Sequence, residues 1–217
     1  MLLWQLIDSG FPSGGFAHSG GLEAAMQHGH VSDAAQVREF ARQAMAQCGR
    51  SMLPLVTAAH QHPCEVPQLD ELCDVFMSNP IANRASRAQG RALLTCVARS
   101  FPDVPVAAFA ETARIDKAAG HYAPLFGALC SMLGVELLDT QRAYLFIAIR
   151  GVGSAAVRLG LMGAFEAQTV QADLSSHIDA VIHDCAAVSP QDIAQTAPLI
   201  DLFQSTHDRL YSRLFQS

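Results

Sequence analysis

The sequence predicts an all-α fold, arranged as a single compact domain of about eight to ten helices. Apolar residues recur at spacings of three and four along most of the chain, as at Val37, Phe40 and Ala41, and this period is typical of helices that bury one face. Alternating runs of β-branched residues, which would indicate strands, are nearly absent. Half of the 217 residues are hydrophobic and 16% are charged, so the chain can fill one sizeable core.

Charge and cysteine content narrow the class of protein. A net charge of −6 argues against nucleic-acid binding, which requires a basic surface. The longest uncharged run, residues 118–135, contains one proline and three glycines and would be a poor membrane span but a good buried helix. Since no basic leader precedes an apolar stretch at the start, we expect a soluble, cytoplasmic protein. The six cysteines form no C-x-x-C pair, so we expect buried free thiols in a reducing compartment.

The first element is an apolar segment, residues 2–7, that runs into a glycine-rich corner at residues 8–15. Asp, Ser, Gly and Pro in the corner favour turns. Ser19 is placed to cap the next helix, with Leu22 and Glu23 in its first turn, where a carboxylate suits the helix dipole. The stretch therefore predicts two helices joined by an ordered elbow.

This elbow does not match the glycine-rich loops that carry out chemistry. A phosphate-binding loop needs a lysine, and the elbow has none. A nucleophile elbow needs G-x-S-x-G, but Ala17 stands where the first glycine would be. A dinucleotide-binding fingerprint follows a strand, and no strand pattern precedes Gly10. We interpret the elbow as a structural corner.

Helical patterns continue to the end of the chain. Gly29 stops the second helix, Ser32 and Asp33 start the third, and Gly49 is expected to end it. Close helix contact, a break near Gly151, or both are expected in the longest segment, because it holds four glycines. The remaining helical segments are residues 52–60, 69–77, 83–99, 106–117, 120–135, 141–168, 173–185 and 190–203.

Three arginines, Arg84, Arg87 and Arg91, share one helix face because they lie three and four residues apart. This stripe is either a solvated basic face, perhaps paired with the acidic helix before it, or a surface for docking a partner. The rest of the chain has few basic residues, so both interpretations stay open.

The residues of the elbow resemble a known family. The run L-x-Q-L-x-D-S-x-x-P-x-G-G-F-x-H-S-x-G-L-E, beginning at Leu3, closely resembles the N-terminal signature of urease accessory protein F. Further blocks that resemble this family lie at residues 86–93, 120–127, 144–146, 154–159 and 207–217. The resemblance therefore extends along nearly the whole chain.

The resemblance implies a function in urease maturation. A member of this family would be a nickel-insertion chaperone that forms a homodimer, binds accessory protein D or H, and recruits the GTPase G, which carries nickel. The assembly would deliver Ni²⁺ to apo-urease, coupled to GTP hydrolysis by the partner and with regulation of that GTPase. The chain itself would not be an enzyme and would hold no tightly bound cofactor.

The resemblance also implies which residues contact partners. Residues 1–205 would form the helical domain and residues 206–217 a docking tail. We expect Arg213, Leu214 and Phe215 to be exposed in this tail, although such a tail can also pack back on its own domain. Large apolar side chains and arginine are favoured anchors in interfaces. Family members often have Tyr where this chain has Phe16 or His18, so we expect neither a hydroxyl role at residue 16 nor a metal-ligand role at residue 18. The expected partner-binding residues are Phe16, His18, Ser19, Gly20, Leu22, Glu23, Tyr211, Arg213, Leu214 and Phe215, together with the arginine stripe.

Two other functions are considered. A stand-alone nickel carrier would use His60, His62 and Cys64, whose imidazole and thiolate groups suit nickel, but their spacing does not gather them on one helix face. A small helical hydrolase would need a Cys or Ser nucleophile with a distant base. The sequence has no H-E-x-x-H or S-x-x-K motif to support it.

Overall fold

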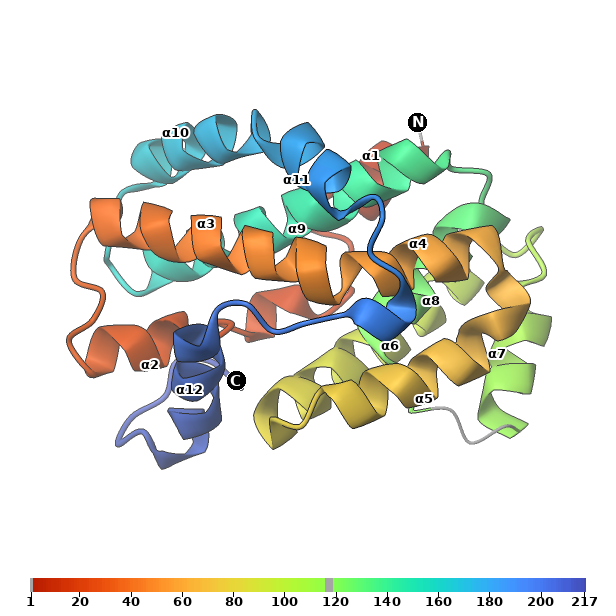
Figure 1. The fold of residues 1–217 in the computed structure, drawn as a ribbon, viewed down its shortest axis with the longest axis horizontal. Coiled ribbons are helices and arrows are strands. Elements are labelled where there is room, and N and C mark those ends of the chain that lie inside the picture. Colours follow the sequence, from red (N-terminus) through yellow and green to blue (C-terminus); the bar gives the residue numbers. More distant parts are fainter. Residues whose placement is uncertain (1, 116–118) are drawn as a thin grey trace.

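The computed structural model describes residues 2–115 and 119–217. Within these residues the chain is helical and contains no strand, which confirms the all-α prediction (Figure 1). Ten of the twelve α-helices in the described residues are at least eight residues long. The helices are α1 (Leu2–Leu6), α2 (Leu22–Gln27), α3 (Ala34–Ser51), α4 (Leu53–Gln61), α5 (Val66–Phe76), α6 (Pro80–Ser100), α7 (Val106–Ile115), α8 (Tyr122–Met132), α9 (Leu137–Arg158), α10 (Ala164–Ser175), α11 (Ile178–Cys185) and α12 (Pro198–Thr206).

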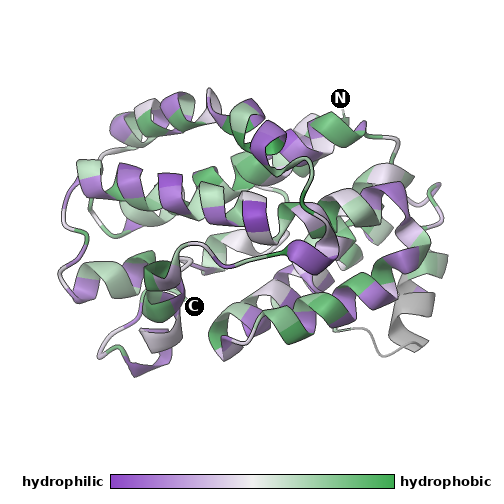
Figure 2. Cartoon of the chain, in the orientation of Figure 1, coloured by the Kyte–Doolittle hydropathy of each residue, from purple (hydrophilic) through white to green (hydrophobic). Residues whose placement is uncertain are grey.

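Two helices, α8 and α9, organise the fold. Helix α8 packs against α4, α5 and α6, and α9 packs against α3, α4, α10 and α11 (Figure 1). Residues 123–130 of α8 are all buried, because every one of them is apolar or small and the helix has no polar face to expose. By contrast, α3 and α5 alternate hydrophilic and hydrophobic residues around the helix (Figure 2).

Helix α8 approaches α4 very closely at Gly127. A Cβ atom there would overlap the backbone carbonyl of Val56. Only glycine lets the two backbones come this near, which explains the glycine inside an otherwise apolar helix.

Several predicted boundaries are correct. Helix α3 begins after Asp33, whose side chain accepts a hydrogen bond from the Gln36 backbone N–H at 2.9 Å. Helix α4 begins at Leu53 with Pro54 in its first turn, where proline is tolerated.

Helix α6 starts three residues earlier than predicted, since Asn79 caps it by accepting from the Ile81 N–H at 3.0 Å.

Gly49 does not end the third helix, contrary to the prediction. Helix α3 continues to Ser51, and Gly49 is a buried position that faces Val181 and Cys185 of α11. The glycine is explained by this close packing rather than by a helix stop.

The long segment 141–168 is two helices, and its break is not at Gly151. Helix α9 passes through Gly151 and ends at Arg158. Gly160 has φ of 72°, and the Leu161 N–H donates to the Ala156 carbonyl at 3.0 Å, which is the Schellman ending of a helix. A Cβ at Gly151 would meet nothing within 4 Å, so close helix contact does not explain this glycine.

Three further predicted segments are corrected in extent. Segment 173–185 is divided between the end of α10 and α11, and segment 190–203 is a 3₁₀ turn, Pro190–Asp192, followed by α12. The helix predicted at 106–117 is α7, described to Ile115; residues 116–118 lie outside the described residues.

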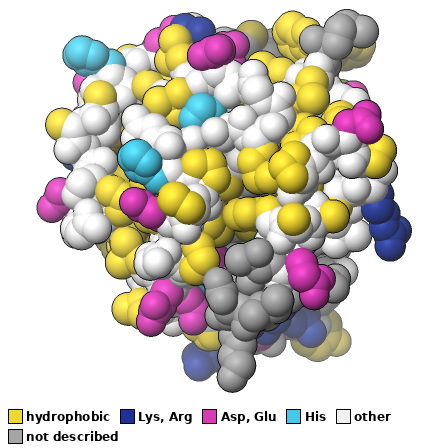
Figure 3. Space-filling model, turned by 90° about the vertical axis from the view of Figure 1, so that its right-hand side faces the viewer, with side chains coloured by type: hydrophobic (Ala, Val, Ile, Leu, Met, Phe, Trp, Pro, Cys, Tyr) yellow, Lys and Arg dark blue, Asp and Glu magenta, His cyan; other side chains and the backbone are white. Residues whose placement is uncertain are grey.

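In the described part of the chain no helix is both long and apolar enough to cross a bilayer. The face at the right of Figure 1 gathers hydrophobic side chains near its centre and basic ones at its margins (Figure 3).

Candidate functional site

The two ends of the chain meet and hold each other. The C-terminal residues return past α12 to the elbow that precedes α2 (Figure 1). The Ser19 N–H donates to the Ser217 carbonyl at 2.6 Å, and the Gln216 N–H donates to the Ala17 carbonyl at 2.8 Å. We call the contact between residues 16–23 and residues 207–217 the tail junction.

Glu23 is the buried anchor of the tail junction. Its side chain is 2% exposed, and its carboxylate accepts the Leu214 N–H at 2.6 Å and the Phe215 N–H at 3.2 Å. His207, which is fully buried, donates through Nε2 to the Phe215 carbonyl at 3.2 Å and places Nδ1 3.8 Å from the Glu23 carboxylate. Burying a carboxylate is costly unless it is hydrogen-bonded, so Glu23 and the tail backbone depend on each other.

His18 and Ser19 fasten the last residue. His18 Nδ1 lies 2.5 Å from the Ser217 hydroxyl, and the Ser19 hydroxyl donates to the Ser217 carbonyl at 3.2 Å. Burial lowers the pKa of His18, and the charges of His207 and Arg84 lower it further. His18 therefore favours its neutral form, in which it serves as a hydrogen-bonding group.

Arg158 of α9 lies between the two chain ends. Its guanidinium carbon is 4.2 Å from the ring centre of Phe16 and 4.1 Å from that of Phe215. It also donates to the Phe16 carbonyl at 2.6 Å. A cation stacked between two aromatic faces is attracted to both, so Arg158 links α9, the elbow and the tail.

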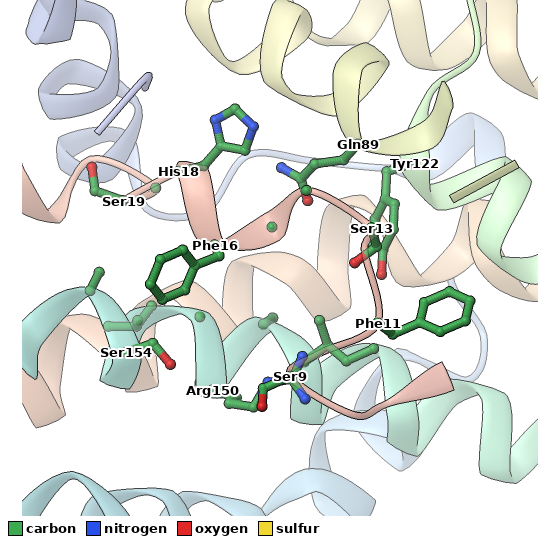
Figure 4. A pocket seen from close by; sticks show the side chains of 18 of the residues that line it. Ser9, Phe11, Ser13, Phe16, His18, Ser19, Gln89, Tyr122, Arg150 and Ser154 are labelled. Carbon is green, nitrogen blue, oxygen red and sulfur yellow. The ribbon is translucent and has the colours of Figure 1, made fainter. Parts of the chain in front are cut away.

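A cavity of about 490 Å³ lies between the elbow and α9. The elbow covers it, α9 lines it from below, and Tyr122 of α8 reaches in from one side (Figure 4). We call it the loop cavity. Its polar lining side chains are Ser9, Ser13, His18, Ser19, Cys48, Gln89, Tyr122, Tyr144, Arg150, Ser154 and Arg158, and its main apolar ones are Phe11, Phe16, Ile147 and Phe215.

The structure brings together most of the partner-binding residues predicted near the chain ends, but two details of the prediction are wrong. Ser19 does not cap α2: the cap position is Gly21, with φ of 93°, while Ser19 binds the tail. Phe215 is not exposed; it is 6% exposed and packs on Arg158. Leu22 is fully buried and so is a core residue.

Other tail residues do face solvent. Tyr211 is fully exposed and Leu214 is 53% exposed, while Arg213 is exposed and pairs with Asp208 at 3.1 Å. The docking function predicted for these residues stays a prediction.

The arginine stripe of α6 divides into three environments. Arg84 forms a salt bridge with Asp208 at 3.1 Å, so it pairs with the tail and not with the acidic helix before it. Arg87 lies near Asp74 of α5. The pKa of the Asp74 carboxyl group is lowered mainly by hydrogen bonds from Asn83 and His121, and the charge of Arg87 lowers it further. Arg91 is exposed. Docking by this stripe stays a prediction.

The residues considered for a nickel carrier do not form a ligand set. His60 lies 2.7 Å through Nε2 from the Val135 carbonyl, and Cys64 is exposed rather than buried as expected. Among residues 2–115 and 119–217, no three His, Cys, Asp or Glu side chains gather as metal ligands would.

Sequence reasoning missed three members of the tail junction, Arg158, His207 and Ser217. Each is far in sequence from the elbow that it contacts, and no local spacing connects residues so far apart.

Comparisons with known proteins give a consistent result. The model of the UreF family matches residues 31–175. The chain is 37% identical to urease accessory protein F of Oryza sativa subsp. indica, over 98% of this chain and 83% of the relative. It is 35% identical to urease accessory protein F of Arabidopsis thaliana, over 99% of this chain and 91% of the relative. It is also 28% identical to urease accessory protein UreF of an Arthrobacter species, over 100% of this chain and 96% of the relative. This similarity therefore includes both segments that form the tail junction.

Proposed function

The chain belongs to the UreF family of urease accessory proteins, and from this premise we propose that it is a nickel-insertion chaperone that bridges two other accessory proteins. In this proposal it binds accessory protein D or H, recruits the nickel-carrying GTPase G, modulates that GTPase, and brings the assembly to apo-urease. The family establishes the coarser statement, a urease accessory role.

The tail junction is the observation that supports docking most directly. Glu23 and Arg158 hold the tail from inside, which leaves Phe16, Tyr211 and Leu214 exposed at 68%, 104% and 53%. Aromatic and aliphatic side chains on a fixed backbone lose little conformational entropy when they bind a partner. We propose that this surface contacts accessory protein D or H.

We further propose that the chain performs no chemistry of its own and acts in the cytoplasm as a homodimer. Nickel is then cargo handled by the whole complex. This proposal follows from the family's accessory role and assigns catalysis to the GTPase partner.

Pull-down from cells that express the accessory proteins together tests the docking surface. The double variant Tyr211→Ala/Leu214→Ala is expected to lose accessory protein D or H, and with it GTPase G. Neither side chain is buried, so the fold should be unchanged. Phe165→Ala on α10 is the matched control, since Phe165 is 94% exposed and lies outside the tail junction. Full retention of both partners by the double variant would contradict the proposal.

Deletion of the last five residues, 213–217, tests the tail in a second way. It should also abolish capture of both partners, but it removes the buried residues Phe215 and Ser217 as well. Comparison with the double variant therefore separates lost docking from lost folding. The same samples report on function: the nickel content of co-expressed urease and the GTP turnover of GTPase G should both change when docking is lost.

A further inference from the structure

We propose that the loop cavity is a binding site for a small organic anion, a carboxylate carried on an apolar or aromatic body. This site would act in addition to the docking function. The inference rests on three features of the cavity: unused hydrogen-bond donors, a lining that has two arginines and no carboxylate, and a volume too large for an inorganic ion.

Two tyrosines supply the unused donors. The rings of Tyr122 and Tyr144 stack with centres 5.7 Å apart, and Tyr144 is only 7% exposed. Within the described residues, neither hydroxyl forms a hydrogen bond, although both side chains line the cavity. Burial raises the pKa of both hydroxyls, so they remain protonated donors. Because both side chains line the cavity, a ligand oxygen there would accept hydrogen bonds from these hydroxyls.

Positive charge lines the cavity without an opposing carboxylate. Arg150 and Arg158 both line it, whereas no Asp or Glu is among its lining residues. The guanidinium of Arg158 already stacks on the rings of Phe16 and Phe215. Arg150 is partly buried, donates to the Ile7 carbonyl, and has a pKa lowered by burial. The carboxylate of Asp8, which does not line the cavity, favours the charged form of Arg150. An anion in the cavity would place a second negative charge beside this guanidinium.

The same lining disfavours a metal cation. A divalent ion would meet two guanidinium groups and no carboxylate. The thiol of Cys48, which also lines the cavity, has its pKa raised by burial to about 12, so it is not the thiolate that a metal requires.

The volume indicates an organic body. About 490 Å³ falls within the range of about 300–1,000 Å³ that is typical of small-molecule sites. Phe11 and Phe16 give this volume apolar walls (Figure 4), and Ile147 also lines it. An inorganic oxyanion would leave most of these walls without contact, whereas an aromatic carboxylate would cover them.

Calorimetric titration of the full chain with two matched probes tests the proposal. 2-Naphthoate carries a carboxylate, and 2-naphthamide has the same shape without the charge. We expect naphthoate to bind at least about tenfold more tightly than the amide. Tyr144→Phe should weaken naphthoate binding by about threefold to tenfold while it leaves the fold intact, because the hydroxyl that it removes has no partner. Arg150→Gln should abolish the preference for naphthoate over the amide.

Arg142→Gln is the matched control. Arg142 is also on α9, but it is exposed and pairs with Asp179 at 2.7 Å outside the cavity, so its loss should leave both affinities unchanged. Three results would overturn the proposal: no naphthoate binding up to about 1 mM, equal affinity for the amide, or inorganic phosphate binding as tightly as naphthoate. If Arg150→Gln fails to fold by circular dichroism, Tyr144→Phe decides alone, and unchanged naphthoate affinity in that variant overturns the assignment.

These titrations use the isolated chain and no partner protein. Failure of the cavity proposal therefore leaves the docking proposal intact. Loss of partner capture by the tail variant likewise does not test whether naphthoate binds in the loop cavity.

Discussion

At the scale of single residues, Glu23 shows how one side chain fixes an entire chain end. A glutamate in the first turn of a helix usually faces water and interacts with the helix dipole. Here the side chain is buried and accepts two backbone N–H groups from the tail. Hydrogen bonds to charged groups contribute more than those between neutral groups, so Glu23 is expected to dominate the stability of the tail junction.

Glu23→Gln should release the tail. The amide keeps one acceptor but turns an NH₂ group toward a backbone N–H, and the loss is expected to be about 1.5–3 kcal/mol of tail binding. Limited trypsin digestion followed by mass spectrometry measures this, because Arg209 and Arg213 lie in the tail. Cleavage there should accelerate by about tenfold or more.

The control for this digestion is Glu39→Gln on α3. Glu39 is exposed and pairs with Arg42 at 2.6 Å, far from the tail, so cleavage at the tail should stay at the wild-type rate. If trypsin cleaves the tail of Glu23→Gln no faster than the wild-type tail, the carboxylate of Glu23 is not the anchor of the tail.

His18 should make the tail junction weaker in acid. Its pKa in the folded chain is lowered from 6.5, chiefly by burial. Between the lowered value and 6.5 the unfolded chain binds more protons, so the contribution of neutral His18 is complete above about pH 6.5 and is lost as the pH falls.

The measurement is the difference in unfolding free energy between wild type and His18→Gln. Other titrating groups are common to both proteins and largely cancel in this difference. We expect the advantage of wild type to be larger at about pH 7.5 than at about pH 5. An advantage that is equal at the two pH values would mean that His18 does not titrate differently on folding.

At the scale of elements, helical period was enough to predict fold class and most helices, but glycines were misread. Gly49 looked like a helix stop and is a packing site. Gly151 looked like a break, which lies instead at Gly160. The reason is physical: a glycine that ends a helix and one that admits a neighbouring helix look alike in sequence. Only the contacted element distinguishes them.

Two glycine substitutions should therefore have opposite effects on stability. Gly127→Ala forces a Cβ against the Val56 backbone and should destabilise the protein by about 1–3 kcal/mol or more. Gly153→Ala in α9 meets nothing within 4 Å and should stabilise it by up to about 1 kcal/mol, since alanine favours the helix. The urea unfolding midpoints of the two variants check this prediction. A Gly127→Ala midpoint equal to that of the wild type would contradict the close approach of α8 and α4.

At the scale of the whole molecule, the tail junction is where prediction from sequence reached its limit. The resemblance singled out both chain ends, including Glu23 and Phe215, but local patterns offered no reason to join them. The pairing of His18 with Ser217 spans 199 positions, and Arg158 joins the two ends from a third element. Such contacts arise from tertiary packing, which helix period does not encode. Phe215 was for this reason expected outside, whereas it helps to close the fold.

The thiols test whether the molecule behaves as one cooperative core. Cys73 of α5 and Cys130 of α8 are buried, and burial raises the pKa of each to about 12. Cys64 is exposed. Because the thiolate is the reactive form, iodoacetamide at about pH 8 should label Cys64 at least about a hundredfold faster than the two buried thiols.

In rising urea, Cys73 and Cys130 should become reactive together. They lie in different helices that pack on each other, and a single domain of this size usually unfolds in one transition. Mass spectrometry of tryptic peptides locates each label, and Cys64 serves as the internal control for reagent activity. Exposure of Cys73 well before Cys130 would show that α5 detaches while α8 stays packed, so that the helices would form two cooperative units and not one.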